Sequence, residues 1–339
     1  MAASIDNLVN VNFIKGDINL LNFGLMLGGS GQHKPYVFSP ADLFLQGEEG
    51  AFYLMRRELL FQDAAGTTPV TAGGDPAGRA LDQSGNNQTA IQTISARRPT
   101  YNSSPDRLSL DKVDDALIIT VPAGGWNGTM VLATDDGTAS YGISIPAGAY
   151  ELGGEYFPGN AIVGAVFRNG ALTAGEKADV ESYFVGNGAT ASYGGVTDFN
   201  YYWRGRSEIT DFPLIDTSSA ESLLLTWYQC SSMISFPLID MGNVDDFRST
   251  WNGCTSLTNF PANAFDNIKS SDMSFCFSRT NLSELSIDGI LVSLVTSGIA
   301  TGIRTFFQSA GSAPSIGTGQ PAIDTLRARG WTVTVTGGY

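Results

Sequence analysis

The fold is decided by a stretch in which TWYQCSSMISFPLID (226–240) is followed by TWNGCTSLTNFPANAF (250–265), one pattern of side chains written twice. The pattern returns every 24 residues, and SEITDFPLID (207–216) is an earlier copy of its second half. This repeat length is typical of a solenoid, in which turns stack because none can bury its own apolar face. The stretch therefore predicts a column of stacked turns over residues 197–339, with a cap at its end.

The large rings of the repeat are predicted to form the interior of this column. They recur at the repeat interval, and a ring that one turn cannot cover is covered by the rings of the turns beside it. We therefore interpret them as structure and not as a binding surface. The predicted core positions are Trp203, Phe212, Trp227, Phe236, Trp251, Phe260 and Phe275.

Three cysteines lie inside the repeats. Cys230 and Cys254 occupy equivalent positions, whereas Cys276 departs from the register, which calls for Ser278 there. An odd count without a secretion signal favours reduced thiols that pack as small apolar groups. A metal site is the alternative, but the chain has one histidine and no close pair of cysteines. We expect core cysteines and no cofactor.

The composition is that of a folded, mainly β protein of two or three domains. The chain has 339 residues, of which 42% are hydrophobic and 15% are charged. Its 40 glycines favour short strands joined by many turns. We expect an N-terminal docking segment (1–45), a β-sandwich (46–196) and a short solenoid with a few helices (197–339).

Charge and hydropathy exclude two classes of partner. The formal net charge is −14 and the 19 basic residues are scattered, which argues against binding to a nucleic-acid backbone. No apolar run approaches the roughly 18 residues needed to insert into a membrane. The first residues lack the basic-then-apolar layout of a signal peptide, so we expect folding in a cytosol.

Two-residue periodicity predicts strands in the middle of the chain, and 3.6-residue periodicity predicts helices after it. The strands are expected at 116–123, 128–136, 140–147 and 161–170. A helix over 172–185 begins with Thr173 and Glu176, the spacing of a capping box. A second helix is expected within 281–298 through Ile287, Ile290, Leu291 and Leu294, and a terminal helix over 322–329 with Leu326 inward and Gly330 at its end precedes a strand over 331–335.

Several phrases resemble known protein modules. LFQD (60–63), AGTTPVTA (65–72) and RPTY (98–101) resemble a module of bacteriophage and prophage tail-associated proteins. That resemblance implies a virion protein with a laminin-G-like or concanavalin-like sandwich. NLVNVNF (7–13) and FGLML (23–27) resemble the opening of contractile-tail sheath subunits, which points toward assembly with other virion proteins.

The repeats resemble the BspA-like branch of the leucine-rich repeats. Residues 247–251 and 254–261 carry its recurrent phrase, and TFFQSAGSAP (305–314) echoes TWYQCSSMIS (226–235) as a degenerate turn. The resemblance implies one short strand per turn and a role in adhesion.

Together the resemblances imply a non-enzymatic bacteriophage virion protein. We expect a tail or baseplate fibre or spike adhesin, exposed on the particle, that binds a host-surface glycan or protein as a receptor. It would dock to other virion proteins through residues 1–45 and form a homo-oligomer, with a trimer as the expected state, because avidity strengthens weak contacts. The alternatives are a capsid decoration or head-fibre protein with a purely structural role, and a polysaccharide depolymerase.

The ligand-binding residues are inferred from the repeat geometry. Positions beside the buried rings are expected to face outward, and these are Arg206, Tyr228, Arg248 and Asn252. Aromatic and amide side chains on a weakly charged surface suit sugars or proteins through stacking and hydrogen bonds.

The sequence gives less support to a catalytic or metal site than to a binding surface. His33 lies in a glycine-rich loop where a catalytic triad is difficult to assemble. Adjacent carboxylates on a strand point to opposite faces, so they cannot act together as a glycosidase pair. We interpret them as solvated side chains in turns. Calcium binding is the alternative interpretation for one set of these oxygen-bearing residues. The carboxylate pairs are Glu48-Glu49, Asp114-Asp115 and Asp135-Asp136, and the calcium candidates are Asp135, Asp136 and Gly137 with Asp82 and Asn86.

Overall fold

The computed structural model describes residues 37–269, 271–300 and 302–339. Residues 38–339 form one compact unit. Most of the expected docking segment (1–45), including His33, therefore lies outside the described residues. The 3-10 helix η1 (Pro40–Phe44) opens the described chain and packs Leu43 and Phe44 into the core.

The described chain is mainly β, as expected. Its first sheet has seven strands in the order β12-β9-β8-β11-β6-β5, with β1 also paired to β11. Every pairing in this sheet is antiparallel. The strands are β1 (Gly50–Leu54), β5 (Thr100–Ser103), β6 (Asp106–Ser109), β8 (Trp126–Thr134), β9 (Thr138–Ile145), β11 (Ala161–Asn169) and β12 (Ile209–Asp211).

A second, five-stranded antiparallel sheet has the order β10-β7-β4-β3-β2. The two sheets meet at Phe167 on β11, whose ring centroid lies 5.4 Å from that of Tyr150 on β10. We call residues 46–196 the two-sheet region. The strands of the second sheet are β2 (Leu60–Phe61), β3 (Arg79–Ala80), β4 (Ala90–Ile91), β7 (Ala116–Val121) and β10 (Gly148–Gly153), and two further 3-10 helices are η2 (Arg57–Leu59) and η3 (Ser95–Arg97).

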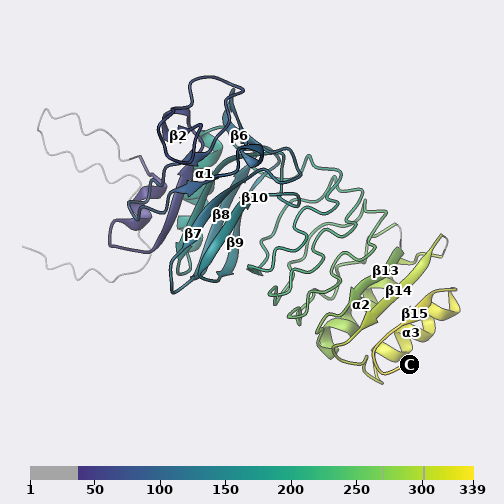
Figure 1. Ribbon diagram of the computed structural model, residues 1–339. Helices are drawn as coiled ribbons and strands as arrows, with labels where there is room; N and C mark the ends of the chain where they lie inside the picture. Colours follow the sequence, from purple (N-terminus) through teal and green to yellow (C-terminus); the bar gives the residue numbers. More distant parts are fainter. Residues whose placement is uncertain (1–36, 270, 301) are drawn as a thin grey trace, which may run out of the picture. The chain divides into compact units, whose positions relative to one another are not determined.

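The four strands expected from periodicity correspond to β7, β8, β9 and β11 (Figure 1). The expectation did not name the other strands of the two sheets, of which β1 and β10 are the longest. In β1 all five residues are buried, so the strand has no polar face to create an alternation. Strand β10 begins with exposed residues, which read as a turn.

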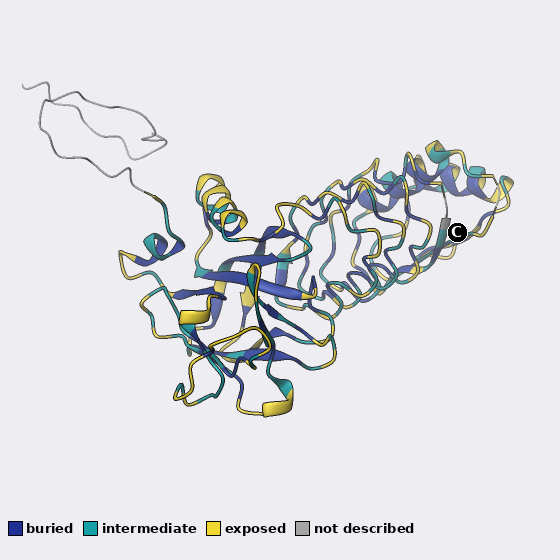
Figure 2. Cartoon of the chain, turned by 90° about the horizontal axis from the view of Figure 1, so that it is seen from above, coloured by how far each residue is buried: buried dark blue, intermediate teal, exposed yellow. Residues whose placement is uncertain are grey.

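Helix α1 (Ala174–Gly186) confirms the capping box. The Thr173 hydroxyl accepts the Glu176 N–H at 3.2 Å, and the Glu176 carboxylate accepts the Thr173 N–H at 2.8 Å. The helix buries Val180 and Phe184 and leaves most of its surface exposed (Figure 2). It lies close to β11 because Gly164 has no side chain, since a Cβ there would stand 2.2 Å from the Phe184 ring.

Residues 197–279, the repeat region, consist of turns that lie side by side (Figure 1). Parallel bridges join equivalent positions of successive turns: Asp198 to Ser222, Ser222 to Asp246, and Asp246 to Asp272. The main chain follows the same rule. The N–H groups of Trp203, Trp227 and Trp251 donate to the carbonyls of Thr226, Thr250 and Cys276 at 3.0, 3.0 and 3.1 Å.

The rings of the repeat region form two stacked columns. In the first column, Trp203 lies 5.7 Å from Trp227 with 1° between the ring planes, and Trp227 lies 5.5 Å from Trp251 with 8°. In the second, Phe236 lies 5.8 Å from Phe212 and 5.4 Å from Phe260. The columns meet edge to face. Six of the seven expected core rings are therefore buried: Trp203, Phe212, Trp227, Phe236, Trp251 and Phe260.

The seventh expectation, Phe275, is wrong. Its side chain is 55% exposed, and Phe277 takes the place in the first column, 5.1 Å from Trp251. The cause is a last turn that is two residues longer, since Asp246 pairs with Asp272 and not with residue 270. Phe275 thus occupies the outward position of Ser249, and both have a positive φ.

The same shift explains Cys276. It precedes Phe277 as Thr250 precedes Trp251, and its side chain is buried. The expectation that Ser278 would take a cysteine position is therefore wrong as well, because the added residues move the register by two. Cys230 and Cys254 are also buried, and all three thiols are free.

The repeat region packs directly against the two-sheet region and is hydrogen-bonded to it. Strand β12 pairs with β9 on one side, and Asp211 bridges in parallel to Ser235 on the other. The Trp203 indole N–H donates to the Tyr141 hydroxyl at 3.2 Å. One hydrophobic cluster runs from Ala51 to Val335, so the core continues across the expected boundary at residue 197.

The C-terminal residues close the repeat region with helices and a parallel sheet. The sheet has the order β13-β14-β15 and the helices pack on each other (Figure 1). The elements are α2 (Glu284–Ser297), α3 (Gly319–Ala328), β13 (Ser271–Ser278), β14 (Arg304–Ser309) and β15 (Thr332–Thr334), which confirms the helices and final strand expected from periodicity. Phe306 lies 5.9 Å from Phe277, so the echo in 305–314 does continue the ring column.

Candidate functional site

Arg206 does not face outward, contrary to expectation. Its side chain is 14% exposed, lies 3.5 Å from the Glu208 carboxylate, and donates to the Gly153 carbonyl at 3.0 Å. It stands where later turns have Cys230 and Cys254, but the first turn abuts the two-sheet region instead of another turn. Arg206 therefore joins the two regions, and only the small exposed part of its side chain reaches a neighbouring groove.

The other three expected residues are at least partly exposed, in different settings. Arg248 is exposed, but its guanidinium is bound to the Asp246 carboxylate at 2.6 Å. Asn252 is half-buried and accepts a hydrogen bond from Arg279 at 3.2 Å. Tyr228 is half-buried and packs against a residue that the sequence did not single out, Arg204.

Arg204 is the centre of what we call the tyrosine cluster, formed with Tyr156, Tyr201 and Tyr228. Its guanidinium carbon lies 4.7, 5.7 and 5.2 Å from the three ring centroids, respectively. One guanidinium nitrogen donates to the Tyr156 hydroxyl at 3.1 Å. The rings hold the cation by cation–π contact while other guanidinium donors stay available.

Local backbone geometry builds this cluster. Tyr201 has a φ of +64°, the left-handed conformation also found at Leu225, Ser249 and Phe275. That conformation turns the side chain away from the ring columns, so Tyr201 is 36% exposed. Tyr156 comes from the segment after β10, and its ring lies 6.0 Å from that of Tyr201.

Beside the cluster is a groove of about 290 Å³, lined by Glu151, Glu155, Tyr156, Arg204 and Gly205 among others. A hydrogen bond to Glu155, together with burial, raises the pKa of Tyr156, whereas Arg204 lowers it. A tyrosine hydroxyl is protonated at neutral pH in any case, since its ordinary pKa is about 10, so it can accept from Arg204 while it donates to Glu155. The groove is lined by two guanidinium groups, of Arg204 and Arg206, by the three carboxylates of Glu151, Glu155 and Glu208, and by an aromatic wall.

A second groove, which we call the polar trough, crosses four successive turns of the repeat region. Its volume is about 410 Å³ and it shares Gly205 with the groove at the tyrosine cluster. It is lined by Gly205, Ser207, Gln229, Ser231, Gly253, Thr255 and Arg279. The expected residues Tyr228 and Asn252 precede Gln229 and Gly253 directly in the chain.

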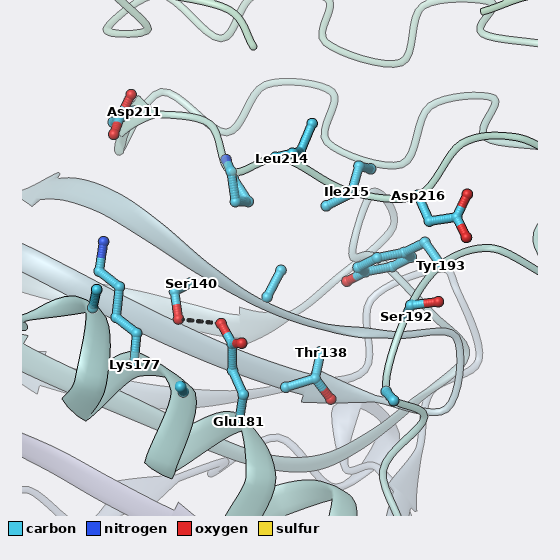
Figure 3. Close-up of a pocket in the computed structure, with 15 residues that line it drawn as sticks. Thr138, Ser140, Lys177, Glu181, Ser192, Tyr193, Asp211, Leu214, Ile215 and Asp216 are labelled. Carbon is cyan, nitrogen blue, oxygen red and sulfur yellow. Dashed lines mark hydrogen bonds between the residues drawn. The ribbon is translucent and has the colours of Figure 1, made fainter. Parts of the chain in front are cut away.

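A third cavity, the α1 cleft, has a volume of about 470 Å³. Figure 3 shows Lys177 and Glu181 extending from α1, with Asp211 and Leu214 on the opposite wall. The Glu181 carboxylate accepts the Ser140 hydroxyl at 2.6 Å. Lys177 makes no ion pair with any residue that the structure describes. With Asp216, three carboxylates face one ammonium, so the cleft disfavours anionic ligands.

The carboxylates named as catalytic or calcium candidates form hydrogen bonds and ion pairs that stabilise the fold. Asp135 accepts the N–H groups of Asn160 and Ala161 at 2.9 and 2.8 Å, and Asp136 accepts the Tyr202 hydroxyl. Asp82 accepts the Phe52 N–H at 3.0 Å. Likewise Glu48 pairs with Arg168, Glu49 accepts from Asn169, and Asn86 donates to main-chain carbonyls.

Asp111, Asp114 and Asp115 form one acidic cluster, with ligand atoms within 4.8 Å of one another. Asp111 accepts the N–H of Val113 at 2.9 Å, and Asp114 lies 3.3 Å from Arg97. The turn itself accounts for these contacts, so we propose no calcium site there.

Sequence reasoning missed Arg204 and Tyr156. Arg204 is the first-turn equivalent of Tyr228, so the repeat register could have added it to the outward set. Nothing in the repeat could have indicated Tyr156, which belongs to the two-sheet region. None of the helices in the described ranges has the length and apolarity needed to cross a bilayer. No protein-family model, curated protein or solved structure matches this chain.

Proposed function

We propose that this chain is a non-enzymatic adhesin of a bacteriophage particle, a tail or baseplate fibre or spike protein that binds a host-surface glycan. The observation that carries the binding role is Arg204 held against three tyrosine rings on a partly exposed surface. Tyrosine rings stack on the apolar face of a sugar, and guanidinium donors bind its hydroxyl groups. The virion setting rests on the phrases in residues 60–101.

The finer architecture is part of the same proposal. Residues 46–196 would be a laminin-G-like or concanavalin-like sandwich, and residues 197–339 a leucine-rich-type solenoid with a C-terminal cap. The parallel bridges at 24-residue intervals support the solenoid. Residues 1–45 would dock to other virion proteins, and a homotrimer would present several binding sites at once.

The test is binding of the full chain to a printed array of bacterial surface polysaccharides. The double variant Y201A/Y228A removes two of the three rings, and we expect it to lose at least about tenfold in affinity, since a stacked ring contributes on the order of 1 kcal/mol. Tyr339→Ala is the matched control, because Tyr339 is 38% exposed, close to the 36% of Tyr201.

A purely structural role, as a capsid decoration or head-fibre protein, gives a different result. In that case the chain binds to the particle and to nothing on the array, and Y201A/Y228A behaves like the wild type. That result would overturn the adhesin proposal.

A polysaccharide depolymerase is the second candidate, and the α1 cleft is the observation in its favour. Hydrolysis of a glycosidic bond needs two carboxyl groups facing one groove, and Glu181 and Asp211 both line this cleft (Figure 3). Release of reducing ends from any arrayed polysaccharide, abolished by E181Q and by D211N, would favour this function. Binding without release favours the adhesin.

A further inference from the structure

The polar trough repeats the same two positions of successive turns. One row consists of residues with left-handed φ values from +57° to +82°, and the row beside it consists of hydroxyl residues. The rows are Gly205, Gln229, Gly253 and Arg279, then Ser207, Ser231 and Thr255. Main-chain hydrogen bonds of 2.8 to 3.1 Å join neighbouring turns, which sets a spacing of about 4.8 Å, and the stacked tryptophan rings lie 5.5 to 5.7 Å apart. A ligand along the trough would therefore meet similar groups at regular steps.

Several polar groups of the trough are not used by the fold. The hydroxyls of Ser207 and Ser231 and the carboxamide of Gln229 make no side-chain hydrogen bond to the described part of the chain. The Arg279 guanidinium donates one hydrogen bond, to Asn252 at 3.2 Å, and keeps its other donors. Among the described residues, no carboxylate lines the trough, and Arg279 is the one charged residue that does.

The main chain of the trough is not available to a ligand. The N–H groups of Gly205, Gln229 and Gly253 donate to the carbonyls of the following turn at 2.8, 2.9 and 2.8 Å. Addition of a peptide strand requires a free edge of N–H and carbonyl groups, which this row lacks. A strand also advances about 3.3 Å per residue, which does not match the step between turns.

We propose that the polar trough binds a linear, neutral glycan that lies across the turns, with consecutive sugar units against consecutive turns. Hydroxyl and carboxamide side chains match the hydroxyls of such a chain, and the step between turns is comparable with the length of one sugar ring in an extended chain. The trough meets the groove of the tyrosine cluster at Gly205, so one end of the glycan would lie against the rings. This inference rests on the proposed adhesin function and adds the ligand's length, charge and direction.

The test uses the full chain and homologous series of cello-, malto- and laminari-oligosaccharides of one to six units, with a uronic-acid series for comparison. Affinity for at least one neutral series is expected to rise with each unit up to about four and then to level off, because the trough row spans four turn positions. The variant S207A/S231A should weaken binding of the four-unit sugar about tenfold and leave single-unit binding unchanged.

The double variant S232A/S256A is the matched control, since these serines follow Ser231 and Thr255 in the chain and do not line the trough. Binding that is independent of length, stronger for the uronic-acid series, or unchanged in S207A/S231A would overturn the trough inference while leaving the adhesin proposal in place. Absence of binding both to these series and to the polysaccharide array would overturn the two together.

Discussion

The two-sheet region and the repeat region bury aromatic rings in opposite ways. In the two-sheet region, Phe167 touches Trp126 and Tyr150 at interplanar angles of 31° and 73°, so each contact is individual. In the repeat region, Trp227 touches its own copies on both sides at 1° and 8°. The first interior depends on many unrelated positions, whereas the second depends on one motif and its register. Damage to the motif should therefore act on two neighbours at once.

The largest expected difference concerns alkaline pH, because all three cysteines belong to the repeat region. Burial raises the pKa of each thiol. Above the ordinary thiol pKa of about 8.5, the unfolded chain releases these protons while the folded chain keeps them. The free energy of unfolding therefore does not depend on these thiols below about pH 8.5. Above that pH it falls by about 1.4 kcal/mol per thiol for each pH unit.

Urea denaturation at pH 7.5, 8.5 and 9.5 measures this slope. The variant C230A/C254A/C276A should flatten it, although buried tyrosines add a loss of their own at still higher pH. An equally steep slope in the triple variant would show that the thiols are not its source.

Truncation of a ring should destabilise the protein by a similar amount, already at neutral pH. Trp227→Ala should cost about 5 kcal/mol, because it leaves a cavity between two stacked rings, and Phe167→Ala about 4 kcal/mol. Since one hydrophobic cluster includes both residues, both variants should shift a single unfolding transition, followed by tryptophan fluorescence and by circular dichroism. A transition that splits in either variant would contradict a shared core.

The joint between the regions supplies the third comparison. Arg206→Ala leaves the Glu208 carboxylate, which is 11% exposed, without its ion-pair partner and should cost about 3 kcal/mol. Arg248→Ala removes an ion pair on a side chain that is 51% exposed and should cost less than about 1 kcal/mol. Thermal unfolding of the two variants checks the difference, and equal losses would mean that Arg206 is not a joining residue.

The smallest expected effect is a difference in stability between variants of Trp203 and of Trp227. The Trp203 indole N–H binds the Tyr141 hydroxyl, so Trp203→Phe should cost about 1–2 kcal/mol beyond the change in ring size. The Trp227 indole N–H makes no hydrogen bond within the described residues, so Trp227→Phe should cost less. Urea denaturation resolves this difference, and a reversed order would indicate that the joint does not depend on this bond.

Much of the repeat region could be predicted from its residues, because periodicity assigns every position at once. That same dependence on period produced the error at Phe275, since the last turn is two residues longer while a phenylalanine still stands at the 24-residue interval. In the two-sheet region, strand β1 is fully buried and has no alternation of apolar and polar residues, so the sequence pattern could not predict it. The tyrosine cluster joins Arg204 to Tyr156 across a fold contact, and no local pattern encodes such a contact.

The near-identical contacts of Trp203 with Trp227 and of Trp227 with Trp251 have an evolutionary consequence. A turn that offers the same surface above and below can be copied within the gene and inserted between its parents without redesign of either end. Recombination within this coding stretch would then lengthen or shorten the polar trough in whole steps, and with it the length of ligand that the proposed site could hold.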